Sequence, residues 1–180
     1  MKGLIILENG FEDSEGLTTY DVLKRAGFDM TTASLQDTII KTQSGVNIKT
    51  NILLKDIVQP ALDYDFLVLP GGRAVFDVLD KSAEITELIK SFNNYHKYIC
   101  AICAAPMLIG KTGLLDGHMY TCFPGCERGK GKKGQDGVIV SGKFITATSM
   151  YYSVSFALTI IEKLIGKNHR VKIEKSLMGK

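Results

Sequence analysis

Cys103 is the residue best placed in this chain for covalent chemistry. It lies in the segment 98–110, where an apolar stretch of strand character changes abruptly into a helix-forming stretch with Pro106 in its first turn. Proline is tolerated there because its missing N–H costs nothing at that position. A side chain on such a turn projects from the sheet edge, and the unpaired N–H groups of the new helix favour a thiolate. The pattern predicts a nucleophilic thiol; the alternative is a small buried apolar residue at a strand end.

An acidic loop near the N-terminus, residues 8–15, supplies carboxylates that could assist this thiol. Glu12 and Asp13 are explained as acidic residues in a first helical turn, where the helix dipole favours them. Glu15 lies far enough into the helix to point back across the sheet rim toward the cysteine turn. Burial there would keep its carboxyl protonated and able to donate a hydrogen bond to a thiolate.

Backbone N–H groups at two further positions could stabilise a developing oxyanion. Gly72 belongs to the turn Pro70-Gly71-Gly72, and Ala104 directly follows the candidate nucleophile. Donors of this kind contribute roughly 3–4 kcal/mol each where mutation has removed them. A cysteine, a carboxyl group and an anion-binding pocket are thus expected to converge.

The elements that must position these groups alternate between short apolar segments and longer amphipathic ones. This alternation predicts an α/β fold, with a mainly parallel sheet covered by helices on both faces. The expected strands span 3–7, 30–34, 65–69, 98–102, 119–121, 138–141 and 144–147, with a hairpin over 39–49, and the expected helices span 15–26, 82–94, 104–111 and 152–165. Residues 125–137 are expected to form a loop, and the tail beyond Gly166 to be frayed or packed locally. Ligands of such sheets bind beyond the carboxyl ends of the strands, where the loops 8–14 and 70–73 and the Cys103 turn would meet.

Composition limits the classes of function. A chain of 180 residues with 45% hydrophobic content can bury one substantial core, so residues 1–180 are expected to form a single domain. The net charge of +3 is too small to indicate a nucleic-acid or membrane-surface protein. No apolar run approaches a membrane span, and the N-terminus turns polar at Glu8, too early for a signal peptide. The four cysteines are then expected to be reduced thiols in a cytoplasmic protein.

The other three cysteines have separate interpretations. Cys100 is three residues from Cys103 on an expected strand and therefore faces the opposite side, which favours a core position over a redox pair. A zinc site formed by all four cysteines is the alternative, but a core Cys100 prevents the four from converging. Cys122 and Cys126 are interpreted as thiols near the rim of the site, one of which forms a reversible disulfide with Cys103 on oxidation, or as two unrelated thiols. No metal and no cofactor are expected.

A basic, glycine-rich stretch covers residues 128–134. Its composition is typical of a mobile, solvated loop. A weak contact with phosphate or nucleic acid is the alternative.

At these residues the chain resembles the ThiJ/PfpI superfamily, and within it the DJ-one and YajL branch. The matching segments follow the family's order over nearly the whole chain: 4–7, 10–15, 24–27, 65–72, 101–106 and 156–162. The resemblance implies a flavodoxin-like three-layer sandwich that forms a homodimer, with Arg25 near the dimer interface. It also implies Cys103 as the nucleophile, Glu15 as its protonated partner, and Gly72 and Ala104 as oxyanion donors.

The chain departs from the family pattern at three places. Phe123 of the segment 120–124 stands where many members have a histidine, so no imidazole base is available there. YajL is similar in having a phenylalanine at this position. Ala104 follows the cysteine, whereas the protease-like branch has a histidine at that position. The segment 148–153 replaces a glycine-rich wall of the pocket, so the choice of substrate does not carry over from relatives.

Two functions are compatible with these features. The leading hypothesis is a cysteine-dependent hydrolase or lyase of the deglycase and glyoxalase type, with weak activity because the histidine is missing. It would act on small reactive carbonyls or their adducts with thiols and amines and protect against stress. The alternative is a non-catalytic redox sensor or chaperone-like protein in which Cys103 is oxidised to sulfinate. A role in thiamine precursor synthesis has only the family label behind it.

Overall fold

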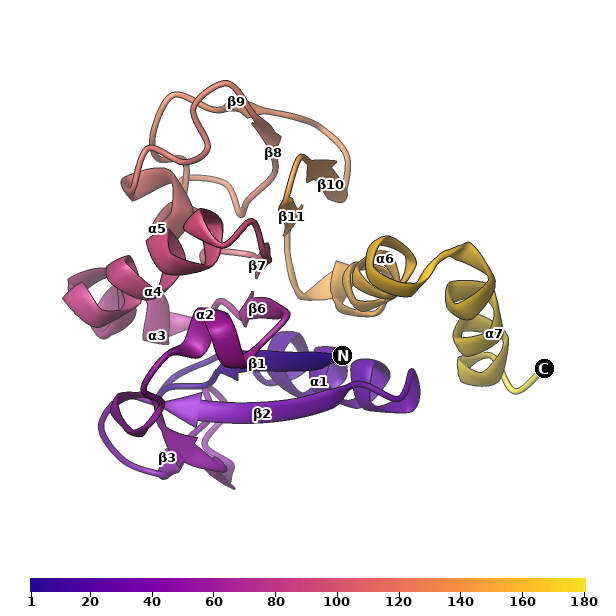
Figure 1. The fold of residues 1–180 in the computed structure, drawn as a ribbon, viewed down its shortest axis with the longest axis horizontal. Helices are drawn as coiled ribbons and strands as arrows, with labels where there is room; N and C mark the ends of the chain where they lie inside the picture. Colours follow the sequence, from indigo (N-terminus) through magenta and orange to yellow (C-terminus); the bar gives the residue numbers. More distant parts are fainter.

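A seven-stranded sheet forms the centre of the molecule in the computed structural model, which describes all residues from 1 to 180 (Figure 1). The strands are arranged in the order β10-β11-β7-β6-β1-β2-β5, and every neighbouring pair is parallel except β10 and β11. Their bounds are β1 Lys2–Ile6, β2 Asp29–Ser34, β5 Ile52–Leu53, β6 Phe66–Leu69, β7 Tyr98–Ile102, β10 Val138–Ser141 and β11 Phe144–Ala147. From β1 the sheet continues to β2 and β5 on one side and to β6, β7, β11 and β10 on the other. The strand order therefore reverses between β1 and β6, which is where ligands bind in such sheets.

Helices cover both faces of this sheet. On one face α1 (Asp13–Arg25) packs against α6 (Ser153–Ile165), and on the other α4 (Ala83–Asn94) packs near α5 (Pro106–Lys111). Alternate side chains of β6 enter the two cores, since Leu67 and Leu69 belong to the α4 side whereas Phe66 and Val68 belong to the α1 side. Strands buried on both faces are apolar throughout. The predicted α/β class, a flavodoxin-like three-layer sandwich, is confirmed.

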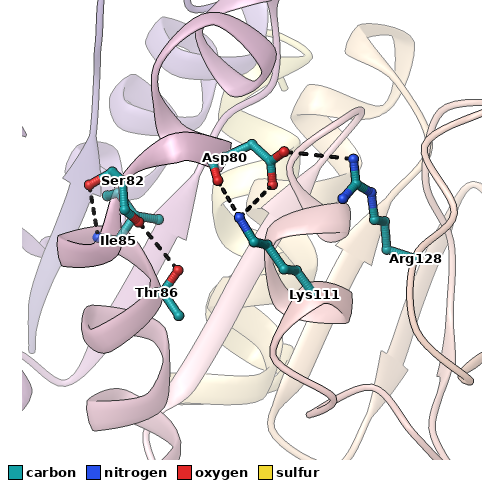
Figure 2. Close-up of polar contacts among 6 residues, drawn as sticks. All are labelled: Asp80, Ser82, Ile85, Thr86, Lys111 and Arg128. Atoms are coloured by element: carbon teal, nitrogen blue, oxygen red, sulfur yellow. Dashed lines mark hydrogen bonds and ion pairs between the residues drawn. The ribbon is translucent and has the colours of Figure 1, made fainter.

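Local signals in the sequence account for where the helices begin and end. Glu12 caps α1, with its carboxylate accepting the N–H of Glu15 at 2.7 Å, and Gly27 follows the helix at φ 83°. Ser82 caps α4 by accepting the N–H of Ile85 at 3.3 Å, as predicted (Figure 2). The predicted hairpin is also present, as β3 (Ile39–Lys41) and β4 (Asn47–Lys49).

Several short elements and one long helix were not anticipated. They are β5, α2 (Pro60–Asp63), α3 (Arg73–Asp77), three 3-10 turns at Leu54–Asp56 (η1), Leu79–Lys81 (η2) and Met150–Tyr152 (η3), and α7 (Lys167–Leu177). The tail beyond Gly166 is thus helical and lies against α6 at the C-terminal end of the fold (Figure 1). Ile173 and Leu177 anchor it by packing on the core that α6 shares. No helix has the length and apolar character needed to cross a membrane.

Residues 125–137 are more structured than a solvated loop. They contain β9 (Lys132–Lys133), which pairs with β8 (Met119–Tyr120). A Cβ on Gly131 would lie 2.6 Å from the carbonyl oxygen of Leu115, and one on Gly110 would lie 2.3 Å from that of Arg128. Gly110 of α5 and Gly131 therefore allow close packing of backbone on backbone, although most side chains of the segment are exposed.

An ionic cluster fastens the same segment to the body of the protein. The Asp80 carboxylate lies 3.3 Å from the Lys111 ammonium and 3.6 Å from the Arg128 guanidinium (Figure 2). Lys111 also donates to the backbone carbonyl of Asp80. The turn after α3, the end of α5 and the basic segment are held together at this point.

Candidate active site

The Cys103 turn has the geometry expected of a nucleophile elbow. Cys103 follows β7 and adopts φ 63°, a left-handed conformation shared among non-glycine residues only by His96. Such a backbone costs of order 1–3 kcal/mol and persists only where its surroundings fix it. Two hydrogen bonds do so here, because the Cys103 N–H donates to the Ala147 carbonyl at 2.9 Å and its own carbonyl accepts the Phe123 N–H at 2.8 Å. The half-buried side chain is held at the carboxyl end of the sheet.

Glu15 lies beside this thiol and is completely buried. Its Oε2 accepts the N–H of Gly71 at 2.8 Å, its carboxyl is hydrogen-bonded to Cys103, and its Oε1 has no hydrogen-bond partner. Burial raises the pKa of Glu15 to about 7, although the hydrogen bonds from Cys103 and Gly71 act in the opposite direction. The expectation that Glu15 points back toward the cysteine is met by this geometry.

The thiol itself does not have the environment that the sequence suggested. Burial raises the pKa of Cys103, and the negative charge of an ionised Glu15 raises it further, whereas the N–H of Ala104 lowers it. The helix that follows is short, and its N–H groups do not outweigh these effects. When Glu15 takes up a proton, its repulsion disappears and its O–H can donate to the sulfur. Because each group shifts the pKa of the other, the two titrations are coupled.

Two glycines let the loops approach each other this closely. A Cβ on Gly71 would lie 2.6 Å from Glu15 Oε2 and 2.8 Å from the Cys103 Cβ. Gly72 adopts φ 92°, and a Cβ there would lie 2.4 Å from the backbone nitrogen of Glu12. Sequence reasoning singled out Gly72 but assigned no role to Gly71, whose position after a buried strand was the available signal.

The two N–H groups expected to bind an oxyanion differ in their present partners. The Ala104 N–H is hydrogen-bonded to the Cys103 sulfur and has no backbone acceptor. The Gly72 N–H has no acceptor in the protein, because Gly72 faces Phe11 in a non-hydrogen-bonded bridge. Both residues line the same cavity as Cys103.

This cavity has a volume of about 510 Å³ and is open to solvent. Its lining comes from the loop after β1, the β3–β4 hairpin, α3, the cysteine turn and the segments 123–126 and 149–150: Glu12, Glu15, Gln43, Gly72, Arg73, Phe76, Cys103, Ala104, Phe123, Pro124, Gly125, Cys126, Ser149 and Met150. The volume is within the range of small-molecule sites. Arg73 belongs to the loop 70–73 that was expected at this edge of the sheet, whereas Gln43 and Phe76 were not anticipated, because neither the hairpin tip nor α3 carried a motif.

The remaining three cysteines lie at different places in the fold. Cys100 is fully buried on the α1 side of the sheet, as predicted, whereas Cys122 and Cys126 belong to the core on the α5 side. All four are free thiols. Cys126 lines the cavity, in line with its expected place near the rim. Cys122 does not line it, because its side chain is fully buried in the core on the α5 side.

Comparison with known proteins shows to which family a chain with this architecture belongs. The family model described as DJ-1/PfpI matches residues 1–163. The chain belongs to the DJ-1/PfpI family. This confirms the resemblance to the ThiJ/PfpI superfamily and its DJ-1 branch.

Individual DJ-1 proteins match over the whole length of the chain. Protein dj-1beta of Drosophila melanogaster is 30% identical over 180 residues, which cover 97% of this chain and 95% of that protein. The crystal structure of Drosophila DJ-1beta superimposes with a TM-score of 0.89 at 31% identity, covering 98% and 97% of the two chains. A structure of Toxoplasma gondii DJ-1, described as oxidized, gives a TM-score of 0.87 at 29% identity over 98% and 97% of the chains.

Two further relatives differ from these DJ-1 proteins, one in its greater length and the other in the activity that its name gives. DJ-1 homolog B of Arabidopsis thaliana is 29% identical over 98% of this chain, which spans 41% of the plant protein. A protein of Pyrococcus abyssi named as a deglycase is 30% identical over 82% of this chain and 89% of its own length.

Proposed function

We propose that this protein is a cysteine-dependent enzyme of the deglycase and glyoxalase type that acts on small reactive carbonyls or their adducts with thiols and amines. The observation that carries the proposal is the pairing of Cys103 with a buried Glu15 at the mouth of a cavity of about 510 Å³. Perturbed titratable groups that face one another in a cleft are typical of catalytic sites. The name of the Pyrococcus abyssi relative supports the same reaction class.

Each component has a role in the proposed reaction with methylglyoxal. The Cys103 sulfur adds to the aldehyde carbon, and the carbonyl electron pair moves to the oxygen, which the N–H groups of Gly72 and Ala104 stabilise. The thiol proton passes to the Glu15 carboxylate and from it to this oxygen. Glu15 then moves the proton of the former aldehyde carbon to the neighbouring carbon, while the hydroxyl proton passes to the oxygen of that carbon. The resulting thioester is hydrolysed by water, which releases lactate and the free thiol.

Turnover is expected to be slow because no imidazole lines the cavity. Phe123 is about half exposed at the position where many relatives have a histidine, and no histidine is among the lining residues. Glu15 must therefore carry every proton transfer by itself. A positioned acid or base contributes typically 10²–10⁴-fold to a rate, which sets the scale of the expected loss.

The experiment is methylglyoxal turnover by the full chain and two cysteine variants. Cys103→Ser is expected to abolish turnover, whereas Cys122→Ser, a change in the core outside the cavity, retains it. Circular dichroism and thermal melts check that both variants are folded. Equal trace turnover in the two variants would refute the enzymatic proposal.

A redox function is the second candidate, and the position of Cys126 on the same cavity as Cys103 favours it. A hydroperoxide would oxidise Cys103 to a sulfenic acid and leave as the alcohol or water. The Cys126 thiol would then condense with it, forming a disulfide and releasing water. The description of the Toxoplasma gondii structure as oxidized supports oxidation within the family.

Mild peroxide treatment followed by peptide mass spectrometry separates the outcomes. A Cys103–Cys126 disulfide that is lost in Cys126→Ser and retained in Cys122→Ser supports the redox switch with Cys126 as the resolving thiol. Finding only sulfinate at Cys103 rules out the disulfide. Modification at Cys103 without turnover of any carbonyl substrate selects the sensor over the enzyme.

The proposal includes a cytoplasmic homodimer. Four free cysteines are suited to a reducing compartment, which would keep the Cys103 thiol available. Arg25 is exposed at the end of α1, where it pairs with Asp21 at 2.8 Å, and the family resemblance implies a position near the dimer interface. Light scattering on the purified chain tests the assembly.

A further inference from the structure

Three large apolar side chains stand around the entrance to the Cys103 cavity. Phe76, Phe123 and Met150 are 49%, 48% and 50% exposed, and all three line the cavity. They come from α3, the segment after β8 and the 3-10 turn η3, which are far apart in the sequence. Most of the surface that the cavity presents is apolar. Apolar side chains gathered from three elements around a nucleophile indicate a binding wall.

Some polar atoms of the same cavity already have protein partners. Gln43 Oε1 accepts the N–H of Arg73 at 3.0 Å, and the Arg73 guanidinium lies 3.6 Å from the carboxylate of Asp77. Glu12 Oε2 accepts the N–H of Glu15 as the helix cap. A polar substituent would compete with the hydrogen bonds at Gln43 Oε1 and Glu12 Oε2, whereas an apolar one would not.

The volume also exceeds what a three-carbon substrate requires. A cavity of about 510 Å³ is large enough for a ligand of drug-like size, and methylglyoxal would leave most of the apolar wall in contact with water. A bulky apolar substituent would remove that wall from water, which favours binding in proportion to the area buried.

We propose that the Cys103 cavity selects electrophiles that carry a bulky apolar substituent close to the reacting carbon, such as a phenyl group, which lies against Phe76, Phe123 and Met150. This deepens the proposed function by naming its substrate class, and it rests on Cys103 being the nucleophile. In the productive orientation the carbonyl oxygen lies at the N–H groups of Gly72 and Ala104 while the substituent covers the wall.

The first test compares kcat/KM for phenylglyoxal and methylglyoxal. Phenylglyoxal is expected to be preferred by about tenfold or more. Phe123→Ala is expected to reduce the preference at least threefold, because it removes one side of the wall. Tyr151→Ala is the matched control, since Tyr151 is 84% exposed next to Met150 but does not line the cavity. Differences in intrinsic reactivity between the two substrates cancel when the variants are compared with the parent chain.

A second test does not require turnover. Cys103 is alkylated with N-benzylmaleimide or N-methylmaleimide, the site is verified by peptide mass spectrometry, and the rate ratio is divided by that for glutathione. A normalised ratio of about ten that falls in Phe123→Ala, but not in Tyr151→Ala, supports the apolar wall. The same result with no ketoaldehyde turnover would reject the proposed enzyme and retain the selectivity. A normalised ratio near one would overturn the inference, whatever the outcome for methylglyoxal.

Discussion

Replacing Glu15 with glutamine should change how the stability of the protein depends on pH. The pKa of Glu15 is raised from 4.5 to about 7 in the folded chain. At about 1.4 kcal/mol per pKa unit, burying the ionised carboxylate therefore costs about 3 kcal/mol. The raised pKa contributes stability that is fully present below pH 4.5 and is lost as the pH rises through 7. Between about pH 5 and pH 8 the wild-type chain should lose about 2.5 kcal/mol from this group alone.

Glutamine keeps the shape of the side chain but has no charge to bury at either pH. Glu15→Gln should thus gain about 2.5 kcal/mol over the wild type on going from pH 5 to pH 8. Urea unfolding followed by circular dichroism measures the free energy of unfolding of both proteins at the two pH values. Subtracting the change in unfolding free energy of the wild type between the two pH values from that of the variant removes the contributions of other titrating groups, including the three histidines.

Glu84→Gln provides the control, because Glu84 is an exposed carboxylate on α4. Its substitution should leave the pH dependence of the wild type unchanged in this range. If Glu15→Gln also follows the wild type from pH 5 to pH 8, Glu15 does not titrate near 7, and the account of the coupled pair is wrong.

Three other predictions follow from the geometry. Gly72→Ala should lower the free energy of unfolding by about 2 kcal/mol or more, because its Cβ would meet backbone atoms. The control Gly27→Ala, at φ 83° in open space, should lower it by about 1 kcal/mol. Equal losses in urea unfolding would contradict the crowding at Gly72. Asp80→Asn should cost about 1 kcal/mol at low salt and less in 1 M NaCl, since the ion pairs in Figure 2 are partly exposed; a loss independent of salt would contradict the ionic origin. The rate of Cys103 alkylation by iodoacetamide should rise only at alkaline pH, because the thiol pKa is raised, and Glu15→Gln should move that rise to lower pH, because it removes the negative charge beside the thiol; identical profiles would exclude the coupling.

The parts of the fold that could be predicted are those in which local signals agree with the tertiary structure. Continuous apolar runs such as 65–69 and capped amphipathic helices such as 82–94 specify their own conformation. The helix α7 was missed because it has few apolar residues and gains its stability from Ile173 and Leu177 against the body of the protein. Residues 125–137 form the expected exposed loop except for β9, which was missed because glycine and lysine are typical of solvated loops, whereas here Gly131 lets the chain pack against Leu115.

The candidate site divides in the same way. Cys103, Glu15, Gly72 and Ala104 each lie directly after a strand or at the start of a helix, so the topology of a parallel sheet was enough to bring them together. Gln43 comes from a hairpin outside the main sheet, and no rule of strand order predicts where its tip will dock. The sequence also could not predict that the pKa of Cys103 is raised, because this shift depends on how deeply the thiol and Glu15 are buried together.

The coupled pair explains why the site needs so few side chains. A thiol with a raised pKa is a poor nucleophile while Glu15 is ionised, but moving one proton from sulfur to carboxylate produces the thiolate and removes its repulsive neighbour in the same step. Gly71 makes this exchange feasible, because any larger residue would push Glu15 and Cys103 apart. The reactive state is therefore set by the distance between two loops, which the backbone fixes. This is why we expect Gly71→Ala, which moves the Glu15 charge away from the thiol, to lower the pH at which Cys103 is alkylated, even though glycine itself takes no part in proton transfer.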